Sequence, residues 1–171
     1  QEVEARPEEL RALVDKAHKY QEDVGERAGA RFLCGNEGLP PWRWGVNKTQ
    51  LREFRSEVQR AVADGCIRGQ SDKSIDYYYD PVKFNDPNVG PNMYQVNEGL
   101  IKPATAEAEL PGLSWALWKN LATGGLPIKL FFSHAWAEGV YEFIDAALAA
   151  WPDALSGDEC GAYFCCLSNP Q

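Results

Sequence analysis

Four side chains in the C-terminal part of the sequence have the types and spacing to do chemistry. Ser133 and His134 are adjacent, and Glu138 and Glu142 follow them closely. Serine and histidine can act as nucleophile and base, and paired carboxylates can act as acid and base. Neighbouring residues of a strand point to opposite faces, so Ser133 and His134 are not expected to hydrogen-bond as a catalytic pair. The two glutamates are interpreted as the solvated first turn of a helix. We therefore predict no catalytic residue.

One ligand-binding hypothesis remains for this stretch. The hydroxyl of Ser133 precedes the start of a predicted helix, where backbone N–H groups favour anions, and it could donate to a phosphate or a ribose. We therefore take Ser133, His134 and Glu138 as candidate cofactor-binding residues. The motifs GxGxxG, GxxxxGK[ST], HExxH and GxSxG are absent from the sequence, and no metal ligand set is predicted.

The elements that position these residues follow from hydrophobic spacing. The apolar run from Ile128 to Phe132 predicts a strand, and Ala162 to Leu167 predicts a second strand. Between them, apolar residues at helical spacing predict a helix with one buried face. Strand, helix and strand with short connections form a βαβ unit with parallel strands. The apolar face of the helix comprises Val140, Phe143, Ile144, Ala147, Leu148 and Trp151.

The N-terminal part is predicted to be helical. An apolar stripe predicts a helix from Pro7 to about Ala28, and Asn47 begins a second helix that Gly65 ends. Ser114 is predicted to cap a third helix. The expected fold class is α/β, with residues 1–65 helical, 66–125 irregular with short helices, and 126–171 a partial βαβ unit. The N-terminal stripe consists of Leu10, Leu13, Val14, Ala17, Val24 and Ala28.

Two loops carry aromatic residues that are candidates for contact with a partner. The Gly- and Pro-rich residues 35–46 place two tryptophans around Arg43, either as a stacking surface or, as we favour, to fix the loop on the core. Residues 66–91 lose regular periodicity, which is typical of a functional or partner-bound segment. Their tyrosines are predicted to cover an apolar surface of the chain's own core or of a neighbouring subunit. The interaction candidates are Trp42, Trp44, Tyr77, Tyr78 and Tyr79.

Composition limits the classes of function. The 17 basic and 25 acidic residues give a net charge of −8, which argues against nucleic-acid binding. No apolar run reaches the length of about 20 residues that spans a bilayer. The five cysteines form no CxxC pair and are interpreted as reduced structural thiols, which favours an intracellular, reducing compartment. A disulfide between Cys34 and Cys66 stays open. The Asn47 sequon is interpreted as a helix cap, and the start at Gln1 suggests a processed or partial chain.

Part of the C-terminal stretch resembles a known family. The residues FFSHAWAE (131–138), with Tyr141, Glu142 and Phe143 after them, resemble the opening of Toll/interleukin-1 receptor (TIR) domains. Residues 92–171, with VNEGLIKP, SHAW and AAWP, are similar to uncharacterised TIR-like proteins of dinoflagellate algae. The resemblance implies a flavodoxin-like start, with either protein–protein interaction or hydrolysis of NAD. An algal source would be compatible with an organellar complex.

The sequence also departs from the TIR pattern. The catalytic glutamate of TIR domains follows the second strand by a wide margin, and none of Glu138, Glu142 and Glu159 has that position. We therefore expect a non-enzymatic structural or protein-interaction module that acts without a cofactor as an accessory subunit of a larger assembly. The alternative is a TIR-like NAD-hydrolysing or nucleotide-binding protein, completed by residues outside this chain.

Overall fold

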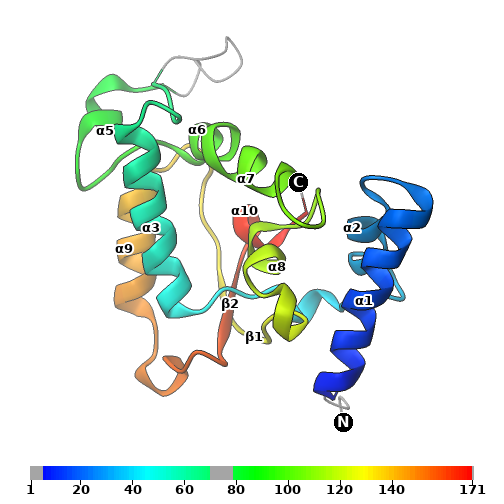
Figure 1. The fold of residues 1–171 in the computed structure, drawn as a ribbon. Helices are drawn as coiled ribbons and strands as arrows, with labels where there is room; N and C mark the ends of the chain where they lie inside the picture. Colours follow the sequence, from blue (N-terminus) through cyan, green and yellow to red (C-terminus); the bar gives the residue numbers. More distant parts are fainter. Residues whose placement is uncertain (1–5, 70–78, 171) are drawn as a thin grey trace. The chain divides into compact units, whose positions relative to one another are not determined.

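A computed structural model describes residues 6–69 and 79–170 (Figure 1). These residues form mixed helix and strand with a two-stranded parallel sheet. They divide into two compact units that interleave along the chain. Unit 1 contains residues 6–46, Ala104–Phe131 and 159–170, and unit 2 contains residues 47–69, 79–103 and Phe132–Asp158. Within the described ranges, no helix has the length and apolar character needed to cross a membrane.

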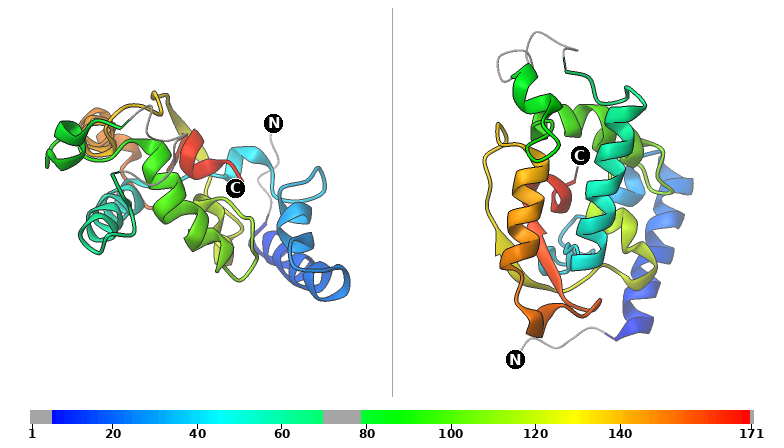
Figure 2. Two further views of the ribbon diagram at one scale, coloured as in Figure 1. Left: turned by 90° about the horizontal axis from the view of Figure 1, so that it is seen from above. Right: turned by 90° about the vertical axis from the view of Figure 1, so that its left-hand side faces the viewer.

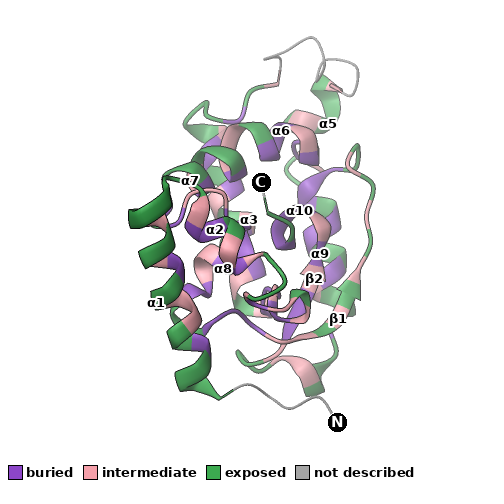
Figure 3. Cartoon of the chain, turned by 90° about the vertical axis from the view of Figure 1, so that its right-hand side faces the viewer, coloured by how far each residue is buried: buried purple, intermediate pink, exposed green. Residues whose placement is uncertain are grey.

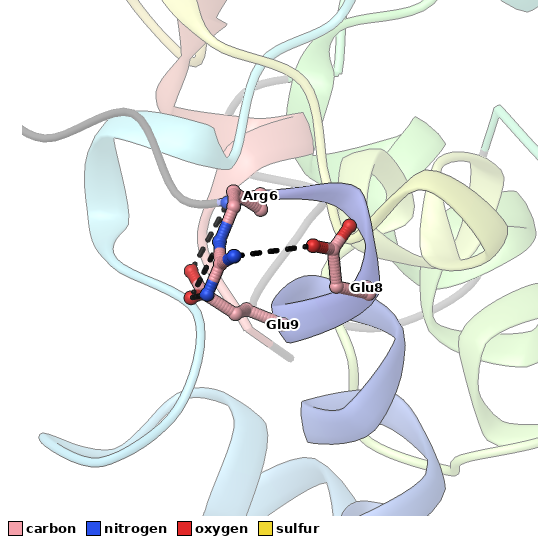
Figure 4. Close-up of polar contacts among 3 residues, drawn as sticks. All are labelled: Arg6, Glu8 and Glu9. Carbon is pink, nitrogen blue, oxygen red and sulfur yellow. Dashed lines mark hydrogen bonds and ion pairs between the residues drawn. The ribbon is translucent and has the colours of Figure 1, made fainter.

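Unit 1 begins with the neighbouring helices α1 (Pro7–Val24) and α2 (Ala28–Leu33). The carboxylate of Glu9 accepts the backbone N–H of Arg6 at 3.1 Å and pairs with its guanidinium at 2.7 Å, which closes the first turn of α1 (Figure 4). These bonds lower the pKa of Glu9. The prediction of one helix to Ala28 was wrong, because Gly25 turns the chain at φ +134°. Val24 consequently lies outside the buried stripe.

The core of unit 1 is built mainly from leucines. Figure 3 shows α1 with one buried and one exposed face, as its apolar spacing requires. Helix α8 (Trp115–Lys119) begins where Ser114 Oγ accepts the N–H of Leu117 at 3.1 Å, so the predicted cap is confirmed. A 3₁₀ turn, η3 (Leu121–Thr123), follows it. The buried cluster comprises Leu10, Ala17, Ala30, Leu33, Leu39, Leu110, Leu113, Leu117 and Leu121.

The parallel sheet pairs β1 (Ile128–Phe132) with β2 (Gly161–Phe164). The bounds of β1 agree with the prediction. The second strand is shorter than predicted, because the chain turns into α10 (Cys165–Ser168) after Phe164. The Oγ of Ser168 accepts the N–H of Phe164 at 3.1 Å, which satisfies a backbone donor at the start of this turn. Cys165 and Cys166 therefore lie on a helical turn.

Unit 2 contains the helices α3 (Lys48–Ala63) and α9 (Val140–Ala150), which lie side by side (Figures 1 and 2). The Oδ1 of Asn47 accepts the N–H of Gln50 at 2.7 Å, and the Gln50 side chain accepts the N–H of Asn47 at 3.1 Å. This capping box confirms the interpretation of Asn47, whose side chain is buried. Arg55 joins the two helices through a bidentate ion pair with Asp145, with both N···O distances 2.8 Å. A 3₁₀ turn, η4 (Asp153–Leu155), follows α9.

The chain between α3 and residue 106 contains more helix than predicted. Asp80 caps the short helix α5 (Pro81–Asn85), inside the segment that was predicted to be irregular. Helix α6 (Met93–Val96) continues through the π-helical turn η2 (Asn97–Ile101) into α7 (Lys102–Ala106). Pro103 lies in the first turn of α7. The chain passes this proline because the π turn changes the hydrogen-bond register just before it, with the N–H of Lys102 donating to Asn97 O.

None of the five cysteines, all in the described ranges, forms a disulfide. The Cys34–Cys66 pairing that the sequence left open is therefore not made in this structure. Burial raises the pKa of the Cys34 thiol to about 11 and also raises that of Cys166, so both favour the protonated form. Cys66 is exposed, so the interpretation as a structural thiol does not hold for it.

Candidate functional site

The three candidate cofactor-binding residues lie in the loop between β1 and α9. Ser133 and Glu138 are exposed, and His134 is half-buried. Glu138 lies before the first residue of α9 rather than inside the helix, and its carboxylate accepts the N–H of Ala135 at 3.3 Å. Within the described ranges, no hydrogen bond joins any two of the three side chains. The three residues are close in sequence, but their side chains do not form a common binding site.

The N-terminus of α9 has few backbone donors available for an anion. The N–H of Val140 donates to Pro91 O at 2.8 Å, and that of Tyr141 donates to Val89 O at 3.0 Å. A phosphate at a helix start is held by these first N–H groups. Because protein carbonyls occupy both, the arrangement anchors the loop to residues 89–91 and gives little support to a phosphate beside Ser133.

His134 packs as an aromatic ring. It stacks on Phe143 with ring centroids 4.3 Å apart and an interplanar angle of 23°. Both ring nitrogens are buried and have no hydrogen-bond partner among the described residues. Burial therefore lowers the pKa of His134 below its ordinary value of 6.5, while the charge of Glu138 acts in the opposite direction.

Replacement of His134 by phenylalanine is expected to reduce the loss of stability on acidification. A folded-state pKa below 6.5 means that the unfolded chain binds the proton more readily. The titration of this histidine therefore leaves stability unchanged well above pH 6.5, and it destabilises the fold as the pH falls below that value. Urea unfolding of both proteins between about pH 7.5 and about pH 5 measures the difference. Parallel stability curves for the two proteins would contradict the expectation.

Trp44 fixes the tryptophan loop to the core of unit 1, which agrees with the favoured interpretation for this tryptophan and leaves it a prediction for Trp42. The loop contains the 3₁₀ turn η1 (Pro41–Arg43). The indole N–H of Trp44 donates to Leu39 O at 3.1 Å, and its ring packs against the leucine cluster. Arg43 lies between the two indoles in sequence but is itself buried, with its guanidinium 5.5 Å from the Trp42 ring centroid. Trp44 therefore serves the fold of its own unit.

The buried position of Arg43 was missed by the sequence reasoning. Its Nε donates to Gly124 O at 2.8 Å, and its Nη2 donates to Gly125 O at 3.0 Å and, more weakly, to Thr123 O at 3.5 Å. The carbonyls of Gly124 and Gly125 directly follow η3 at two left-handed glycines, and Gly125 O also accepts the Thr123 hydroxyl at 3.4 Å. An arginine in a Gly- and Pro-rich loop carries no local signal that its charge will be buried.

Only one of the three predicted interaction tyrosines can be placed. Tyr77 and Tyr78 lie outside the described residues. Tyr79 is half-buried and meets Phe84 edge to face, with ring centroids 6.0 Å apart. Phe84 belongs to α5, which has no buried residue, so whether the tyrosines cover the core or a neighbouring subunit stays a prediction.

One edge of β1 is paired by residues 43–45 at Leu126, just before the strand begins, and no described segment pairs with that edge from Ile128 to Phe132. Pro127 O accepts the N–H of Gly161 at 2.8 Å on the side of β2. On the opposite side, Leu126 donates to Arg43 O at 2.6 Å and accepts from Gly45 N at 3.0 Å. Successive residues of a strand direct their N–H and C=O groups to alternate sides. Ile128 and Leu130 therefore direct theirs away from β2, where no described strand or bridge continues the pairing.

The outward face of β1 carries an exposed aromatic residue next to this free edge. Phe131 is 71% exposed, and it stacks on Tyr163 of β2 with centroids 5.0 Å apart and planes within 6°. Lys129 is exposed on the same face. The sequence predicted an apolar run from Ile128 to Phe132, and neither the exposure of Phe131 nor the pairing of only one edge was visible in it.

Among the described residues, no group of three or more His, Cys, Asp or Glu could hold a metal ion. Comparisons with protein-family models, curated proteins and solved structures found no match for this chain.

Proposed function

We propose that this chain is a protein-interaction module, an accessory subunit of a larger assembly, which docks by accepting a strand at the free edge of β1. The observation that carries the proposal is this edge, with Phe131 exposed beside it. Proteins usually cover, shorten or charge the edges of their sheets, since unpaired N–H and C=O groups recruit other strands. A β1 edge that displays an aromatic residue is suited to recruitment.

The chemistry of such docking has two parts. The backbone N–H and C=O groups of Ile128 and Leu130 can form hydrogen bonds with the backbone of any extended segment. The outward side chains of Lys129 and Phe131 supply selectivity, because a bound strand places its own side chains opposite them at about 5 Å. The apolar ring of Phe131 leaves water when it is covered, which adds to the affinity.

The proposal includes a TIR-like or flavodoxin-like start of the fold, which the order β1, α9, β2 supports. In such sheets the first strand has a neighbour on both sides. Here residues 43–45 flank the chain at Leu126, and from Ile128 on β2 is the one neighbour of β1 among the described residues, so a strand supplied by a partner would occupy the remaining length of the other edge. This arrangement links the sequence resemblance to an interaction rather than to catalysis.

Replacement of Phe131 by aspartate is expected to lower the recovery of bound partner by about tenfold or more, since it removes the apolar contact and adds a charge at the edge. The matched control is Val24→Asp, because Val24 is equally exposed at 71% but lies at the end of α1. Tagged wild-type and variant chains are retrieved from the native source, and co-purifying proteins are measured by quantitative mass spectrometry. Circular dichroism confirms that the variants are folded.

Equal recovery of every partner by wild type and Phe131→Asp would overturn the docking surface. The alternative, hydrolysis of NAD, would require carboxylates held in a site. Glu142 is exposed and Glu138 is engaged with the N–H of Ala135. Release of nicotinamide from NAD by the purified chain would support that alternative against the interaction module.

A further inference from the structure

We propose that the strand accepted at the free edge of β1 is β1 of a second copy of this chain, in antiparallel pairing across a twofold axis. This inference rests on the proposed docking at that edge and names its occupant. Two two-stranded sheets would then become one continuous sheet. Twofold contacts are the commonest in homo-oligomers, and they require a surface that complements itself.

The backbone of β1 meets this requirement in one register. In antiparallel pairing, hydrogen-bonded pairs form between residues that direct their N–H and C=O groups to the shared edge. In β1 these include Ile128 and Leu130, as the Gly161–Pro127 bond establishes. When Leu130 lies opposite the partner's Leu130, all five residues of the strand overlap with their counterparts.

The same register makes the outward side chains complementary. Lys129 then lies opposite the partner's Phe131 in a pair without hydrogen bonds, where Cα atoms are about 4.5 Å apart and side chains are closest. An ammonium group over an aromatic face is attractive. Each Phe131 would lie between Tyr163 of its own chain, on which it already stacks, and the partner's Lys129.

The neighbouring registers are less favourable. A shift of two residues in one direction places Lys129 opposite the partner's Lys129, so that like charges face each other. A shift in the other direction pairs Phe131 with the partner's Phe131, but leaves Lys129 opposite the partner's Ser133 without an aromatic ring. Both shifts also shorten the overlap of the two strands. Because a single short strand buries little area, we expect the dimer to dissociate at about micromolar concentration.

The test uses cysteine pairs that report the register. Lys129→Cys and Phe131→Cys are each made in a Cys66→Ser background, because Cys66 is exposed. In the proposed register, cysteines at positions 129 and 131 of opposite chains are within disulfide distance, whereas two cysteines at position 129 are about 7 Å or more apart. Mild oxidation of the mixed variants is expected to give a covalent dimer of twice 19.1 kDa, with a yield about tenfold above that of either variant alone.

A second measurement needs no cysteine. Sedimentation of the wild-type chain over a concentration series is expected to show a monomer and a dimer in exchange. Leu130→Pro removes an N–H that points away from β2, so it is expected to abolish the dimer while the circular dichroism spectrum is retained. Phe131→Lys places like charges opposite each other and is expected to give the same loss without a proline.

Equal cross-linking of the single variants and the mixture overturns the register. A wild-type chain that stays monomeric at every concentration overturns the self-pairing. The second result would leave the proposed function standing if partners from the source are still lost on Phe131→Asp replacement, because another protein would then supply the strand. If the wild-type chain stays monomeric and Phe131→Asp also leaves the recovery of every partner unchanged, both proposals are overturned.

Discussion

Replacement of Arg43 by alanine is expected to lower the free energy of unfolding by about 3 kcal/mol, because it removes the donors from buried carbonyl oxygens. Arg43 is only 6% exposed, and its guanidinium donates to the carbonyls of Gly124 and Gly125 at 2.8 and 3.0 Å. Both glycines have left-handed backbones, and Gly125 O accepts the Thr123 hydroxyl at 3.4 Å in addition to the arginine. The loss is therefore larger than that of a surface arginine.

Comparison of Arg43→Lys with Arg43→Ala separates the contribution of the charge from that of the guanidinium geometry. Arg43→Lys keeps the charge but replaces the planar fork with one ammonium group, so it is expected to lose about half as much stability. Arg11→Ala is the control, since Arg11 is exposed on α1, and it is expected to change stability by less than about 0.5 kcal/mol. Urea or guanidinium unfolding measures all three. An Arg43→Ala protein as stable as Arg11→Ala would contradict the role of the buried guanidinium.

Replacement of Gly29 by valine is expected to destabilise unit 1 by about 3 kcal/mol, through overpacking between α1 and α2. A Cβ at this position would lie 2.6 Å from Ala17 O and 2.8 Å from Leu110 Cδ2. The oxygen belongs to the backbone of α1 and cannot move aside without displacing the helix. Gly29→Ala is expected to cost less, about 2 kcal/mol, because only the Cβ collides and alanine favours the helix.

The matched control is a valine elsewhere on the same helix. Arg31 lies two residues further along α2 with its side chain exposed, so Arg31→Val keeps the helix contact intact. It is expected to change the free energy of unfolding by less than about 1 kcal/mol. Thermal and denaturant unfolding distinguish the two. Equal stability of Gly29→Val and Arg31→Val would show that α1 can shift away at little cost.

Several elements followed from signals within a few residues. Asn47 and Gln50 predicted their own capping box, Ser114 predicted its cap, and the run Ile128–Phe132 predicted β1 with the bounds that the structure has. Such signals succeed because a cap or an alternating pattern involves residues that are neighbours in the chain. They failed at Gly25 and after Phe164, where the apolar pattern (helical spacing in the first case, an apolar run in the second) continues past the point at which the backbone changes conformation.

The sequence by itself therefore determined the helical caps, the first strand and the residues that form the apolar faces. Tertiary structure decided which charge is buried at Arg43, which glycine allows α1 and α2 to approach at Gly29, and which edge of β1 stays open beside Phe131. The physical reason is the same in each case. A buried carbonyl, a facing helix and a missing strand partner all belong to segments far away in the chain, and no local propensity reports them.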